Sequence, residues 1–194
     1  DTDNRFVCVS RERRFGKTVA ARTIQAYYDN SCDSHDLFAP YEIARDPSYE
    51  AHINKYDVIG LDVQTFFQFS QDHKTFVERL ERAVRDEVCE KWSSIDGLDE
   101  MTLADALATV HETTGARFIF VIDEWDAVFR YYPNDAALQK DWIHFIRDMY
   151  KQGGTDESVA LVYMTGILPV KKYKTQSSLN QDFEYTMLRP LELE

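Results

Sequence analysis

The sequence contains few glycines, prolines and cysteines, and it has no long apolar segment. Its 194 residues include 7 Gly and 5 Pro, about half the usual share, which argues against a disordered or low-complexity chain. The 3 Cys are odd in number and widely spaced, which suits a reducing compartment and disfavours a disulfide framework. The longest apolar runs, at residues 118–122 and 159–164, are much shorter than the roughly 18 residues that span a bilayer. We therefore expect a cytoplasmic protein with no membrane partner.

Positive charge is scarce as well. The chain carries 22 Lys and Arg against 34 Asp and Glu, a formal net charge of -12. An acidic surface repels phosphodiester backbones at long range, so nucleic-acid binding is not supported. Hydrophobic residues make up 44% of the chain, and we expect residues 1–194 to form a single domain around one core. Because residues 1–4 are polar and lack an initiator Met, we also expect a fragment of a longer protein.

Short apolar runs alternate along the chain with segments of helical periodicity. Strands that are apolar on both faces and separated by helices imply a parallel sheet with helices on both sides. The predicted fold class is therefore α/β, with three layers around a mainly parallel sheet. Residues 30–56 contain many polar groups and two prolines, and we expect them to be mostly loop. The patterns predict strands at residues 5–10, 57–63, 117–122 and 158–164, and helices at 17–29, 74–92, 102–114 and 133–152.

The loop after the first predicted strand ends in Gly16-Lys17-Thr18. Glycine lets the backbone approach a phosphate group, and the N–H groups of a helix N-terminus attract its negative charge. In this pattern the lysine reaches the β- and γ-phosphate oxygens, and the threonine hydroxyl ligates Mg²⁺. The full pattern has another glycine where this chain has Arg11, and an ordinary helix start is the alternative interpretation. We expect Lys17 to lie at the exposed edge of the sheet, outside the core.

Two acids, Asp123 and Glu124, follow the third predicted strand. An apolar strand that ends in two acids is typical of the Walker B motif. There the first acid orients Mg²⁺ and its waters, and the second polarises the attacking water. Adjacent carboxylates at a buried strand end are costly without a cation or another partner. The alternative is that Asp123 caps the following helix and Glu124 is a solvated acid of the loop.

The chain resembles the AAA-ATPase-like family of bacterial proteins, within the additional-strand division of P-loop NTPases. The resemblance covers nearly the whole chain, with Glu12 and Trp125 standing where the family usually has Pro and Tyr. It places Arg11 among the family's features. Full-length relatives look like fusions to a C-terminal nuclease-like domain of the PD-(D/E)XK type, and we expect the present sequence to end before such a domain. The resemblance rests on residues 11–18 (RERRFGKT), 122–126 (IDEWD), 165–169 (TGILP) and 178–180 (SLN).

The resemblance implies a site at the carboxyl ends of the strands. Thr165 stands at the sensor-1 position after the fourth strand, where a polar residue touches the γ-phosphate or the attacking water. The first strand is expected beside the fourth, followed by the third and the second, because that order brings Lys17, Asp123 and Thr165 together. The implied metal ligands are Thr18 and Asp123, the implied catalytic residues are Glu124 and Thr165, and the implied nucleotide-binding residues are Arg13, Arg14, Phe15, Gly16, Lys17 and Thr18.

Several residues near these motifs have more than one interpretation. Arg13 and Arg14 contact phosphates, pair with Asp126, or form surface ion pairs. Trp125 belongs to the core or stacks on a base, and Asp62 at the end of the second strand is a candidate partner of Lys17 or Mg²⁺. The basic cluster of Lys171, Lys172 and Lys174 is a solvated loop or a contact for phosphate or a partner.

The sequence therefore predicts an ATP-binding domain that hydrolyses ATP with Mg²⁺. The alternative is a nucleotide-binding switch or scaffold module with little or no turnover, which the Arg11 loop and the lack of an identifiable arginine finger favour. A nuclease is disfavoured, because no Asp…Glu-x-Lys group lies on a credible strand–turn–strand unit. The sequence does not indicate an oligomeric state.

Overall fold

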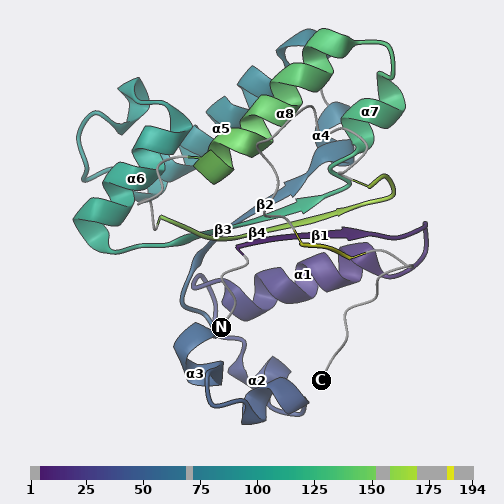
Figure 1. The fold of residues 1–194 in the computed structure, drawn as a ribbon. Coiled ribbons are helices and arrows are strands. Elements are labelled where there is room, and N and C mark those ends of the chain that lie inside the picture. Colours follow the sequence, from purple (N-terminus) through teal and green to yellow (C-terminus); the bar gives the residue numbers. More distant parts are fainter. Residues whose placement is uncertain (1–4, 69–71, 152–157, 170–182, 186–194) are drawn as a thin grey trace.

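Parallel strands form a central sheet between two layers of helices in the computed structural model (Figure 1). The structure describes residues 5–68, 72–151, 158–169 and 183–185. Within these residues the strand order is β2-β3-β4-β1-β5, which confirms the predicted α/β class and the predicted neighbours of the first four strands. The fifth strand was not predicted; it pairs in parallel with β1 on the side away from β4. The strands are β1 (Phe6–Ser10), β2 (Asp57–Asp62), β3 (Phe118–Asp123), β4 (Val159–Gly166) and β5 (Phe183–Tyr185).

The four long helices occur where the periodicity predicts them. Helix α1 covers one face of the sheet, with α2 and α3 beyond it, and the remaining helices cover the other face (Figure 1). The short helices α4 and α7 were not predicted, and neither were α2 and α3, which lie within residues 30–56, expected to be mostly loop. Helix α4 begins at Val63, so β2 ends one residue earlier than expected. The helices are α1 (Lys17–Tyr28), α2 (His35–Phe38), α3 (Tyr49–His52), α4 (Val63–Gln68), α5 (Phe76–Lys91), α6 (Leu103–Thr114), α7 (Ala127–Tyr131) and α8 (Ala136–Lys151), with 3₁₀ turns at Glu42–Arg45, His73–Thr75 and Leu98–Glu100.

Cap residues at both ends explain where α6 begins and ends. The Thr102 hydroxyl accepts a hydrogen bond from the backbone N–H of Asp105 at 3.2 Å, which satisfies a donor of the first turn. Gly115 ends the helix in the left-handed region, with φ of 75°, a conformation that glycine adopts without a steric penalty. The last residue of the helix predicted at 133–152 lies outside the described residues.

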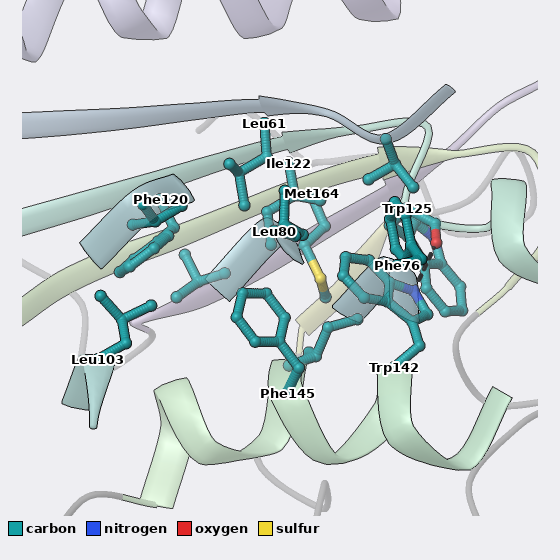
Figure 2. Close-up of a cluster of buried hydrophobic side chains, with 14 of the residues drawn as sticks. Leu61, Phe76, Leu80, Leu103, Phe120, Ile122, Trp125, Trp142, Phe145 and Met164 are labelled. Atoms are coloured by element: carbon teal, nitrogen blue, oxygen red, sulfur yellow. Dashed lines mark hydrogen bonds between the residues drawn. The ribbon is translucent and has the colours of Figure 1, made fainter. Parts of the chain in front are cut away.

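Strand β3 is buried on both faces and divides the core into two parts. Phe118, Phe120 and Ile122 face the layer of α5, α6 and α8, whereas Ile119 and Val121 face α1. This period of two is the pattern of a central parallel strand. Figure 2 shows the larger of the two clusters, in which aromatic side chains of the helical layer pack against the sheet.

Trp142 of α8 fixes the helical layer to the end of β3. Its side chain is fully buried, and its Nε1–H donates a hydrogen bond to the backbone oxygen of Trp125 at 2.8 Å (Figure 2). A buried indole N–H needs such a partner. This hydrogen bond therefore anchors the turn after β3 to helix α8. None of the described helices is both long and apolar enough to cross a membrane.

Candidate functional site

The β1–α1 loop (residues 11–16) has an unusual backbone conformation. Arg14 and Gly16 have φ of 70° and 73°, so two left-handed residues stand two positions apart. When left-handed residues alternate with other residues in this way, successive backbone N–H groups point toward one side and create a concavity that binds anions. Gly16 is also the N-cap of α1, so the positive end of that helix adds to the same field. The backbone therefore offers donors for a phosphate group.

Lys17 is buried, which corrects the expectation that it lies exposed at the sheet edge. Its side chain is 8% exposed, and its ammonium donates hydrogen bonds to the backbone oxygens of Arg11 and Glu12 at 3.0 and 2.9 Å. Lys17 thus bonds back to the first two residues of the loop that precedes it. The other predicted binding residues of this segment, Arg13, Arg14, Phe15, Gly16 and Thr18, are all exposed.

Asp123 and Thr165 lie against each other at the ends of β3 and β4. The Thr165 hydroxyl donates a short hydrogen bond to Asp123 Oδ1, and the same oxygen accepts the backbone N–H of Glu124 at 3.0 Å. Thr165 is fully buried and Asp123 is 8% exposed. The hydroxyl therefore orients the carboxylate, and a contact between Thr165 and a γ-phosphate stays a prediction.

Glu124 begins the β3–α7 turn (residues 124–126) in a strained conformation. Its φ is 54°, which is uncommon for a non-glycine residue and is a feature of functional sites. Its half-buried carboxylate forms a short ion pair with the Arg130 guanidinium. Burial raises the pKa of the Glu124 carboxyl above its ordinary value, the nearby charge of Arg130 opposes that rise, and the charges of Asp126 and Lys17 have smaller effects. Glu124 is thus close enough to Lys17 to sense its charge.

Asp126 is the fully buried acid of the same turn. Its Oδ2 accepts hydrogen bonds from the backbone N–H groups of Ile167 and Leu168 at 3.2 and 2.9 Å, and it lies 3.3 Å from Arg130 Nε. The arginine that pairs with Asp126 is therefore Arg130, and the proposed pairing with Arg13 or Arg14 is wrong. A carboxylate with these partners is compensated for its burial.

The segment after β4 joins the loop to the turn. The backbone N–H of Arg11 donates to the oxygen of Gly166 at 3.1 Å, and the Ser10 hydroxyl donates to the oxygen of Leu168 at 3.3 Å. At Gly166 a Cβ atom would lie 2.6 Å from the Trp125 ring and 2.9 Å from Asp126 Oδ1. Gly166 therefore permits a close approach that holds the two sides of the site together.

Two residues with open interpretations have structural roles. Trp125 is fully buried and packs edge-on against Phe129 with ring centroids 5.5 Å apart, which favours the core interpretation. Asp62 is exposed at the end of β2, and its two oxygens accept hydrogen bonds from the backbone and hydroxyl of Thr65 at 2.9 and 2.8 Å. Asp62 therefore caps the start of α4. The basic cluster at 171–174 and the residues 178–180 lie outside the described part of the chain.

The chemistry of the donors fits a magnesium nucleotide. Mg²⁺ in nucleotide sites takes one or two protein oxygens together with phosphate oxygens and waters. Thr18 in the first turn of α1 and Asp123 at the end of β3 are oxygen donors of this kind. Among the described residues there is no group of three or more His, Cys, Asp or Glu side chains that could hold a metal alone, so any Mg²⁺ here depends on the phosphates.

Sequence reasoning missed Arg130 and the partners of Asp126. Arg130 stands four positions after Asp126 on a helix of five residues, too short for a clear periodic signal. The spacing of Asp126 and Arg130 is nevertheless that of an i,i+4 ion pair. This spacing is therefore the signal in the sequence that could have indicated the pair of Asp126 and Arg130. The backbone partners of Asp126 come from the residues after β4, far away in the sequence, and could not be inferred locally.

A comparison with known proteins agrees with this arrangement. A family model described as "Predicted AAA-ATPase" matches residues 1–175 of the chain. The chain belongs to this family. No curated protein sequence and no solved structure matches it. Membership in the AAA-ATPase-like family supports nucleotide binding at a general level and confirms the family resemblance.

Proposed function

We propose that this AAA-ATPase-like chain binds ATP and hydrolyses it with Mg²⁺. The observation that carries the proposal is the placement of two strained non-glycine residues on either side of β4. Arg14 and Glu124 both have positive φ, and they lie beside Lys17 and Asp123 at one edge of the sheet. Asn54, the other described non-glycine residue with positive φ, is explained by its side-chain hydrogen bonds to Ala26 and Asp29.

In this proposal the β1–α1 loop and the start of α1 bind the triphosphate. Backbone N–H groups and Lys17 contact the phosphate oxygens, and Lys17 exchanges one loop carbonyl for a phosphate when ATP enters. Arg13, Arg14 and Phe15 are exposed beside this position and contact the remaining phosphate and ribose surface. Thr18 and Asp123 hold Mg²⁺, which when bound offsets the charge that develops on the phosphates.

Glu124 is the proposed general base. Its carboxylate accepts a proton from the attacking water, whose oxygen forms a bond to the γ-phosphorus. The bond between that phosphorus and the β–γ bridging oxygen breaks, and ADP leaves with the electron pair. Thr165 holds Asp123 in orientation through its hydroxyl. The products are ADP and inorganic phosphate.

Glu124→Gln tests the proposal directly. The amide keeps the size of the side chain and loses the basic oxygen, so Mg²⁺–ATP should still bind while phosphate release falls about 10²- to 10⁴-fold. The measurements are phosphate release and the bound nucleotide recovered from the full-length protein. Glu112→Gln, at an exposed position of α6, is the matched control and should release phosphate at the wild-type rate. Equal rates for wild type and Glu124→Gln would contradict the assignment.

The second candidate is a nucleotide-binding switch module. It is favoured by the ion pair between Glu124 and Arg130, which occupies the carboxylate that should act on water. In that case the wild-type protein binds Mg²⁺–ATP and releases no phosphate above background. Isothermal titration together with phosphate release separates the two functions.

A further inference from the structure

Arg130 is placed to control the carboxylate of Glu124. Its side chain is 15% exposed and that of Glu124 is 21% exposed, and the short contact runs from Nη2 to Oε2. No described residue donates a hydrogen bond to the other oxygen, Oε1. Half-burial strengthens such a charged contact relative to a pair in open water. One oxygen is therefore fixed while the other can face a water.

Arg130 also has a second charged neighbour besides Glu124. Its Nε lies 3.3 Å from Asp126 Oδ2, and that oxygen also accepts the N–H groups of Ile167 and Leu168. Asp126 is fully buried and cannot move without breaking these bonds. The guanidinium thus lies against a carboxylate of the β3–α7 turn that is bonded to the residues following β4.

We infer that Arg130 is a positioning residue, which holds the Glu124 carboxylate in a reactive orientation and takes its own orientation from Asp126. The inference rests on the proposed function, because it assigns Glu124 as the base. The backbone at Glu124 is strained, with φ of 54°, and the contact with Arg130 fixes the side chain that this backbone carries. Without a partner, a side chain on such a turn samples several rotamers, and small misplacements of a base are costly in rate.

The experiment compares Arg130→Ala and Arg130→Lys with wild type in the full-length protein. Arg130→Ala should lower kcat by about 10- to 100-fold, with the Kd for Mg²⁺–ATP within about twofold of wild type because Arg130 is assigned no contact with ATP. Arg130→Lys should recover part of the lost kcat, because the contact is single and an ammonium can make it. Arg85→Ala is the matched control, since Arg85 is a half-buried arginine bonded to the backbone of Met101, and it should leave kcat unchanged.

A measurement without nucleotide tests the ion pair itself. Arg130→Gln should lower the melting temperature more in the wild-type background than in the Glu124→Gln background, because the second lacks the charge that Arg130 contacts. Equal losses in the two backgrounds would overturn the inference. A wild-type kcat, or a higher one, in Arg130→Ala would overturn it as well, and so would a loss of ATP binding equal to the loss of kcat. If wild type has no turnover, the proposed function fails first and this assignment fails with it.

Discussion

The β1–α1 loop and the β3–α7 turn face each other across the end of β4 and are built in opposite ways. In the loop the side chains of residues 12–16 are exposed, as Phe15 is at 56%, and the backbone carries the geometry. In the turn the side chains of Glu124 and Asp126 are engaged with Arg130 and with backbone N–H groups. A site made by backbone tolerates changes of side chain, whereas a site made by carboxylates does not. This difference explains why Arg11 can stand where the common phosphate-loop pattern has glycine.

The largest expected effect is on the stability of the turn. Asp126→Ala should lower the free energy of unfolding by about 3–5 kcal/mol, because it removes the charge beside Arg130 and the acceptor of two backbone N–H groups. Urea denaturation of the nucleotide-free protein measures this change. The matched control is Asp62→Ala at the neighbouring strand end, where the lost helix cap should cost only about 0.5–2 kcal/mol. Similar losses for the two variants would show that Asp126 is not a structural acid.

The next effect is on ligand affinity at the loop. Lys17→Ala removes a charge-assisted contact to phosphate, which should weaken ATP binding by about 10- to 150-fold. The two hydrogen bonds to Arg11 and Glu12 are also lost, so a small decrease in melting temperature should accompany it. Calorimetric titration measures the affinity, with Lys55→Ala as a control that removes one exposed charge. Unchanged affinity would remove Lys17 from the binding site.

The smallest effect tests whether backbone alone shapes the loop. Arg14→Gly should raise the free energy of unfolding by about 0.5–1 kcal/mol, because relief of the left-handed strain exceeds the entropy that glycine adds to the unfolded chain. Arg13→Gly should lower it by a similar amount, since Arg13 has no positive φ to relieve. Chemical denaturation of both variants decides the matter. A loss of stability in Arg14→Gly would mean that the Arg14 side chain holds the loop.

The sequence predicts the sheet well because its strongest signals are local. The apolar runs at β3 and β4 and the periodic faces of α5 and α8 each occur within one element, and the motif at 16–18 carries its own geometry. The strand order followed from chemistry that needs Lys17 and Asp123 at one edge. The short helices α4 and α7 could not be seen, because five or six residues do not establish a helical period.

The unpredicted part of the site depends on contacts between distant segments. The burial of Lys17 follows from the way the loop folds back over the ammonium, which no pattern of polar and apolar residues encodes. The partners of Asp126 come from the residues after β4, and the pair of Arg130 and Glu124 forms only after the chain turns at a positive φ. Such features depend on tertiary structure and are typical of functional sites.

The position of β1 has a consequence for how the protein folds. Among the described strands β1 is translated first, yet both of its neighbours, β4 and β5, come much later in the sequence. Contacts with such a large sequence separation close slowly, because a long loop must lose its entropy before the pairing stabilises it. Until β4 has emerged from the ribosome, β1 has two unpaired edges, which are sites for misassociation. The loop that follows β1 thus acquires its shape only after β4 has been translated.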